Sequence, residues 1–145
     1  MMPSLNFSLL ASGYLVVLSA YHLATGLVSF AAPQLALKLY RGAYGCDPIE
    51  RRHLLIILRP WGALAVFAGL AGFSALACPP VRVWIEASLI ALLAMRVTYR
   101  IGLRGELREI SGIPPRNNFI NIGLLLLGIG LLATDLGLRC LPGPA

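Results

Sequence analysis

The chain is poor in charged residues, and above all in acidic ones. Only 12% of its 145 residues are charged, whereas a soluble domain usually carries about a quarter. Its three cysteines lie far apart in the sequence, which excludes a disulfide scaffold and a cysteine-ligated zinc motif. The sequence also lacks a metal-ligand cluster, a phosphate-binding loop and a nucleophile–base pair. These absences predict a protein without catalytic residues, without a metal site and without enzymatic activity.

Hydrophobic residues make up 58% of the chain and gather in four long segments. The segments cover residues 7–32, 54–77, 81–101 and 118–138. Each is long enough for a helix to cross a hydrocarbon core about 30 Å thick. None alternates apolar and polar residues as the strands of a membrane β-barrel do. The sequence therefore predicts an all-α, polytopic membrane protein, a four-transmembrane-helix bundle that forms a single domain over residues 1–145.

The first apolar segment is expected to be a retained membrane span and not a signal peptide. No Lys or Arg precedes it, and its apolar run exceeds the h-region of a signal peptide, which has about 7–15 residues. After this span, residues 33–40 predict a short interfacial helix that begins at Pro33 and is broken by Gly42, Gly45 and Pro48. The third helix is expected to run past the membrane to Ile110, where Ser111 and Gly112 end it.

Basic residues are concentrated on one side of the predicted bundle. Only Arg82 and Arg139, of the twelve Lys and Arg residues, lie on the other side. The ten on the basic side are Lys38, Arg41, Arg51, Arg52, Arg59, Arg96, Arg100, Arg104, Arg108 and Arg116. The positive-inside rule then places both long loops in the cytoplasm and both termini on the non-cytoplasmic side, in what we expect to be a bacterial inner membrane. This clustering beside apolar segments predicts membrane lipids, and no nucleic acid, as partners.

Two pairs of opposite charges lie inside the predicted spans, where ionisable groups are costly. Arg82 and Glu86 are four residues apart on the third helix, and Asp135 and Arg139 are four apart on the fourth. This spacing predicts two local ion pairs near the outer interface. The alternative is that Glu86 or Asp135 carries a proton or a cation.

Several polar side chains are expected at a similar depth in the cytoplasmic half of the bundle. These candidate ligand-binding residues are His22, Arg59, Trp61, Arg96, Tyr99 and Asn121. If their helices pack together, the arginines can hold the anionic head group of a lipid or a quinone-like molecule. The alternative is that the arginines reach out to lipid phosphates and that His22 bonds to a neighbouring helix. The sequence requires no cofactor, and a lone histidine is a weak signal for a metal or a tetrapyrrole.

Arginines recur every four residues at the end of the third helix. Arg96, Arg100, Arg104 and Arg108 form one slowly drifting stripe along that helix. We expect Arg100, Arg104 and Arg108 to contact anionic lipid at the membrane surface. The alternative is that they dock onto an acidic surface of a protein partner.

Small residues mark the faces on which the predicted spans pack, because helices in lipid associate through close contact. These residues are Ser12, Ser19 and Gly26 in the first span, Gly62, Ala65, Gly69, Gly72 and Ala75 in the second, and Gly123, Gly128 and Gly130 in the fourth. The faces either close the bundle or dock another protein.

Two of the cysteines lie at helix ends on the predicted outer face. Cys78 ends the second span and Cys140 ends the fourth, on the side that an oxidising compartment bathes. They are candidates for a disulfide if the two helix ends are adjacent, and independent thiols otherwise. Cys46 lies in a cytoplasmic loop and is expected to stay reduced.

Two stretches resemble segments of the small DoxX-like four-helix membrane proteins. Residues 26–40 are similar to the family's first loop, where a helix ends in proline and a short amphipathic segment ends in Leu-Tyr. Residues 59–64, Arg-Pro-Trp-Gly-Ala-Leu, look like the Arg-x-x-Gly opening of its second helix, whereas Arg41 before Gly42 departs from the family's pattern. The resemblance implies a four-helix membrane fold. It says little about function, because the family is diverse and only some members are linked to electron-transfer or quinone-related complexes.

The leading functional prediction is a non-catalytic integral membrane subunit that packs against or stabilises a larger membrane complex. It follows from the absence of catalytic motifs and of a folded extramembrane domain. Other membrane protein subunits are then expected partners in addition to lipids. The alternatives are a membrane protein that binds a lipid or quinone-like ligand, and a small proton-coupled transporter that uses Glu86 or Asp135.

Overall fold

Helices make up nearly all of the described structure, a computed structural model that describes residues 3–44, 51–109 and 112–140. Within these ranges there are six helices and no strand: α1 (Pro3–Ala31), α2 (Pro33–Tyr44), α3 (Arg51–Ala77), α4 (Pro79–Gly102), α5 (Arg104–Glu109) and α6 (Pro115–Cys140). Three helical stretches are long and apolar enough to cross a membrane, namely Phe7–Ala31, Leu55–Ala77 and Pro115–Cys140. The prediction of an all-helical membrane protein is confirmed at this level.

α4 differs from those three helices because it carries more charge. It spans 24 residues but contains Arg82, Glu86, Arg96 and Arg100. α4 is therefore less apolar than the three candidate spans, although it is long enough to cross a hydrocarbon core.

Prolines begin several helices at or near the predicted positions. α2, α4 and α6 start at Pro33, Pro79 and Pro115, where the missing backbone N–H needs no intrahelical partner. Gly42 itself does not break the helix, because α2 continues through it to Tyr44, and the other two predicted breakers, Gly45 and Pro48, lie outside the described residues. A single glycine lowers helix stability by only about 1 kcal/mol, which tertiary packing readily offsets.

The third predicted helix ends earlier than expected. α4 stops at Gly102, and Leu103 separates it from the short helix α5. Gly102 and Gly105 flank this interruption, and glycine is the weakest helix former apart from proline. The chain turns again at Gly112, whose φ of 65° is the only positive φ among the described residues. An L-residue with a side chain rarely adopts this conformation, so glycine suits the turn.

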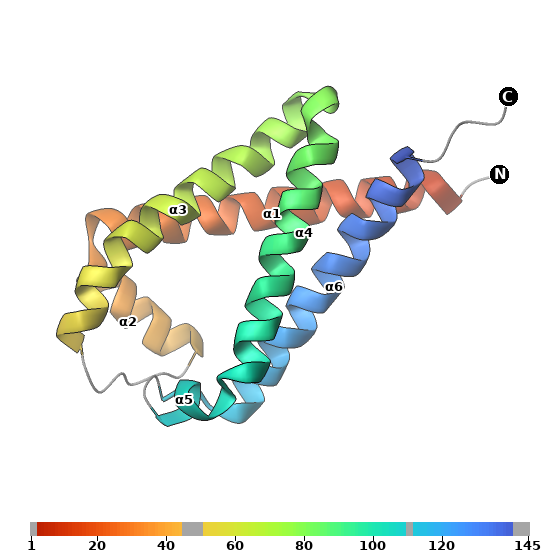
Figure 1. Ribbon diagram of the computed structural model, residues 1–145. Coiled ribbons are helices and arrows are strands. Elements are labelled where there is room, and N and C mark those ends of the chain that lie inside the picture. Colours follow the sequence, from red (N-terminus) through yellow and green to blue (C-terminus); the bar gives the residue numbers. More distant parts are fainter. Residues whose placement is uncertain (1–2, 45–50, 110–111, 141–145) are drawn as a thin grey trace, which may run out of the picture.

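Glycines bring the C-terminal half of α1 and the middle of α3 into close contact (Figure 1). A Cβ atom added at Gly26 would lie 2.7 Å from the carbonyl oxygen of Gly62, and one at Gly62 would lie 2.7 Å from that of Gly26. Two turns further along α3, a Cβ atom added at Gly69 would lie 2.8 Å from the backbone of Leu23 and of Ser19. The predicted small-residue faces of the first and second spans therefore close against each other.

The second closely packed pair is α4 with α6, and α1 crosses this pair (Figure 1). The hydrophobic core at the crossing consists of Leu15 from α1, Leu89 and Leu93 from α4, and Leu132 from α6. Nearby, the ring of Tyr14 occupies the space beside Gly128 on α6. The predicted small face of the fourth span is thus only partly used, since nothing lies near a Cβ added at Gly123 or Gly130.

Polar side chains form an unusually large part of the interior. The buried side chains of the described residues comprise ten hydrophobic ones and seven polar or charged ones. Large apolar side chains point outward instead, with Leu9, Phe67 and Trp84 each more than 70% exposed. An apolar exterior around a polar interior suits a protein whose solvent is lipid.

Candidate functional site: the arginine hollow

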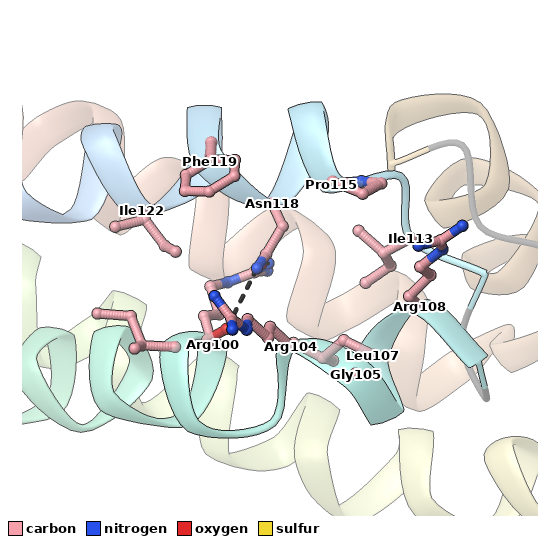
Figure 2. A pocket seen from close by; sticks show the side chains of 11 residues that line it. Arg100, Arg104, Gly105, Leu107, Arg108, Ile113, Pro115, Asn118, Phe119 and Ile122 are labelled. Atoms are coloured by element: carbon pink, nitrogen blue, oxygen red, sulfur yellow. Dashed lines mark hydrogen bonds between the residues drawn. The ribbon is translucent and has the colours of Figure 1, made fainter.

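A hollow of about 320 Å³ opens where the end of α4, the short helix α5 and the start of α6 meet (Figure 2). Three of its lining residues are the stripe arginines Arg100, Arg104 and Arg108. Its apolar lining includes Ile101, Leu107, Ile113, Phe119 and Ile122, and no acidic side chain lines it among the residues that the structure describes. We call this region the arginine hollow.

The interruption after α4 gives the hollow its shape. α5 turns away from the axis of α4, and its Leu107 is buried, which holds the short helix against the rest of the protein. The N–H of Ile113 donates to the carbonyl of Leu107 across 3.1 Å, just after the turn at Gly112. The side chain of Ile113 is thereby placed in the wall of the hollow, next to Arg108 in Figure 2.

Asn118 fixes one wall of the hollow by bonding to Arg100. The Arg100 guanidinium donates to Asn118 Oδ1 across 2.9 Å, and Asn118 Nδ2 donates to the backbone carbonyl of Arg100 across 3.1 Å (Figure 2). Asn118 is buried, so α4 and α6 are joined at this end by a two-way polar contact.

Arg104 and Arg108 are exposed and differ from Arg100 in their surroundings. In the part of the chain that the structure describes, neither of them pairs with a carboxylate. Exposed guanidinium groups that no carboxylate of the described residues pairs with, beside an apolar wall, suit an amphiphile with a negatively charged head group.

No family model, curated protein or solved structure matches the chain. The chemistry of the hollow, and of the polar groups described next, therefore rests on the residues themselves.

A second cluster of charges lies at the other end of α4 and α6, and we call it the carboxylate–arginine network. Its members are Arg82, Glu86, Asp135 and Arg139. Arg82 Nε donates to Glu86 Oε1 across 2.6 Å, and Arg139 Nε donates to Asp135 Oδ2 across 2.9 Å. Both predicted pairs along single helices are thereby confirmed.

The interpretation of these pairs as two separate units is wrong, because a third contact joins them. Arg82 Nη2 donates to Asp135 Oδ2 across 2.8 Å and links α4 to α6. The same Nη2 donates to Ser12 on α1, and Arg139 Nη2 donates to Ser8 on α1, each across 3.0 Å. The network thus ties three helices together.

Among the six predicted ligand-binding residues, His22 and Arg96 meet. The Arg96 guanidinium lies 3.0 Å from His22 Nε2, and His22 Nδ1 lies 2.8 Å from the carbonyl of Leu18. A guanidinium only donates, so Nε2 accepts and Nδ1 carries the proton that Leu18 accepts. Both ring nitrogens are engaged, and a metal or tetrapyrrole at Nε2 would have to displace Arg96.

The structure distributes the other four of these residues over different surroundings. Arg59 lines a separate shallow hollow beside α2, together with Lys38. The ring of Trp61 meets that of Tyr40 edge-on at 6.0 Å. Tyr99 is exposed, and Asn121 Nδ2 donates to the carbonyl of Asn117 in its own helix.

The two helix-end cysteines, Cys78 and Cys140, are both free and exposed. Cys46 lies outside the described residues. Within the described ranges, no group of three or more His, Cys, Asp or Glu side chains comes close enough to hold a metal ion.

The sequence prediction did not single out Asn118 or the link between Arg82 and Asp135. The sequence offered an indication for Asn118: it is a polar residue at the start of the fourth span, and a short connection places that start near the end of the helix that carries the arginine stripe. Ser8 and Ser12 had a weaker one: they lie four residues apart near the outer end of the first span.

Proposed function

We propose that the protein crosses the membrane four times and binds an anionic phospholipid in the arginine hollow. The observation that carries this proposal is the convergence of Arg100, Arg104 and Arg108 on one hollow that has apolar walls and no acidic lining. A phosphate oxygen accepts hydrogen bonds from guanidinium groups, often two at a time. The apolar residues beside them offer a surface for the start of an acyl chain.

The proposed fourth span is α4, and its charges are the main objection to that role. Polar groups on other helices form hydrogen bonds with most of these charged side chains. Arg82 bonds to Asp135 and Ser12, Arg96 contacts His22, and Arg100 bonds to Asn118. Ionisable residues inside a membrane are tolerated where they face the interior and pair with polar groups. α4 therefore fits a span that is covered by α1 and α6.

The proposed orientation puts the arginine hollow on the cytoplasmic side and both termini on the other side. It follows from the excess of basic residues near the hollow and α2. The cytoplasmic leaflet carries anionic lipids, so the orientation also brings the hollow to its proposed ligand. α2 is proposed to lie at the interface there, with Ala36 buried and Lys38 exposed.

The lipid proposal predicts a selective loss of binding in the double variant Arg104→Ala/Arg108→Ala. Each basic residue near an anionic surface contributes about 1 kcal/mol, so the variant should bind roughly 30-fold more weakly. The measurement is titration of the detergent-solubilised protein with short-chain phosphatidylglycerol, with phosphatidylcholine as the uncharged reference. Arg116→Ala is the matched control, because Arg116 is exposed but does not line the hollow.

Three outcomes of this titration contradict the proposal. They are equal binding of both lipids by the natural protein, unchanged binding in the double variant, and an equal loss in the Arg116 control. Binding of a quinone in preference to phosphatidylglycerol would assign the hollow to that ligand instead.

A second candidate function is an accessory subunit of a larger membrane complex. It is supported by three glycines at intervals of seven residues on α6, Gly123, Gly130 and Gly137, beside which nothing lies within 4 Å of an added Cβ. They share one exposed face, and close approach at glycine is how many membrane helices associate. The proposed occupant is a membrane-spanning helix of a partner protein.

The subunit candidate predicts that Gly130→Leu releases a partner that co-purifies from native membranes in mild detergent. Gly13→Leu is the matched control, since Gly13 is equally open but belongs to α1. Recovery of the natural protein without any other membrane protein, or the same partner bound to both variants, would count against this function.

The DoxX-like resemblance stays a prediction.

A further inference from the structure

The carboxylate–arginine network holds two acids in unequal positions. Asp135 Oδ2 accepts hydrogen bonds from both Arg82 and Arg139. Glu86 receives one hydrogen bond, from Arg82 Nε to its Oε1, while its Oε2 is buried and has no hydrogen-bond partner. A buried carboxylate oxygen without a donor is costly, because burial removes the water that would otherwise bond to it.

The count of charges in the buried part of the network is also unequal. The side chains of Arg82, Glu86 and Asp135 are 9%, 0% and 1% exposed, whereas that of Arg139 is 31% exposed. If both acids are ionised, the three enclosed groups carry one positive and two negative charges. If Glu86 is neutral, the net charge of these three enclosed side chains is zero, because Arg82 and Asp135 form the one charged pair among them.

The surroundings of Glu86 offer a place for the proton. Arg82 holds the two carboxyl groups beside each other, because its Nε donates to Glu86 Oε1 across 2.6 Å and its Nη2 donates to Asp135 Oδ2 across 2.8 Å. Two carboxyl groups at one guanidinium repel each other when both are ionised, and a proton on one of them removes that repulsion. The other groups that face the network are the two arginines and the hydroxyls of Ser8 and Ser12 on α1.

We propose that Glu86 is a proton-binding site, occupied at neutral pH, and that Asp135 is the permanent carboxylate of the network. The site lies at the end of the molecule opposite the arginine hollow and does not depend on lipid binding there. Loss of the proton would leave Glu86 ionised beside Arg82 and Asp135, so proton binding and the contacts between α4 and α6 are linked. This linkage is the first requirement of a proton-coupled membrane protein.

The test is infrared spectroscopy of the full chain in lipid at neutral pH, in the C=O stretching region of a protonated carboxylic acid. The chain is suited to it, because it contains only six acidic residues. We expect one band that shifts on exchange into D₂O, disappears in Glu86→Gln and persists in Glu106→Gln. Glu106 is the matched control because it is exposed on α5.

A second measurement separates the proton from the packing. Glutamine has the shape of neutral glutamic acid, so Glu86→Gln should fold and melt like the natural protein at neutral pH. The proposal is overturned if the natural protein shows no such band, if Glu86→Gln keeps it, or if Glu86→Gln does not fold. Loss of the band in Glu106→Gln would also overturn it.

Discussion

The carboxylate–arginine network and the arginine hollow contain the same cation in opposite surroundings. In the network, Arg82 is buried between two carboxyl groups and a serine hydroxyl, and its guanidinium joins three helices. In the hollow, Arg104 and Arg108 are exposed and face apolar walls without an acidic lining.

The difference shows that the neighbours of an arginine decide whether it stabilises the fold or is available to bind a ligand. A buried guanidinium whose donors are taken by the protein's own acids has nothing left to offer a ligand. An exposed one without such acids can bind an anion and adds little to folding. The first three predictions below test this contrast through the free energy of unfolding, measured by circular dichroism during titration of mixed micelles with a denaturing detergent. The fourth tests it through lipid binding.

The largest effect is expected from Asp135→Asn, which keeps the shape of the side chain and removes its charge. Arg82 and Arg139 would both lose the negative charge with which their guanidinium groups pair. Breaking a buried ion pair from one side typically lowers the free energy of unfolding by about 3–5 kcal/mol. Glu106→Gln, the same kind of change on the exposed face of α5, should stay within about 0.5 kcal/mol of the natural protein. Similar values for the two variants would remove the contrast between the regions.

An intermediate effect is expected from Arg82→Lys. The arginine reaches Glu86, Asp135 and Ser12 at once through Nε and Nη2, and an ammonium group cannot reproduce that geometry. The loss of charged hydrogen bonds should lower the free energy of unfolding by about 1.5–3 kcal/mol.

The matched substitution in the hollow is Arg104→Lys. Its free energy of unfolding should change by less than about 0.5 kcal/mol, because Arg104 is exposed. If Arg104→Lys lowers the free energy of unfolding more than Arg82→Lys does, the hollow contributes more to stability than the network, and the contrast is wrong.

The fourth prediction concerns Gly112→Ala, which tests the wall of the hollow through lipid binding. The φ of 65° at Gly112 costs a residue with a side chain about 1–2 kcal/mol. The strain should shift Ile113 and weaken binding of phosphatidylglycerol, with no effect on the network. Gly102→Ala is the control, since nothing lies within 4 Å of an added Cβ, its φ is not positive and it does not line the hollow. Equal lipid affinity in all three proteins would show that the turn does not shape the hollow.

Much of the fold could be predicted from the sequence, because it depends on local order along the chain. Runs of apolar residues predicted the membrane helices, and Pro33 predicted the start of α2. The end of α4 was misplaced, since Gly102 and Gly105 are each tolerable in a helix and only packing decides whether a helix continues through them. The orientation in the membrane and the fourth span stay predictions.

The sequence by itself determined which groups are neighbours along one helix. The spacing of four residues was enough to pair Arg82 with Glu86 and Asp135 with Arg139, and to align the arginines of the stripe. Helix periodicity fixes such neighbours whatever the helix packs against.

Only the tertiary structure decided which helices meet and therefore which polar groups meet across them. It joined Arg82 to Asp135, brought Arg96 to His22, and placed Arg59 beside α2 instead. The rotation of each helix about its axis is set by close packing of small residues, such as Gly26 against Gly62, and that packing is a property of two surfaces at once. A similar depth in the membrane is therefore not enough to bring side chains from different helices together.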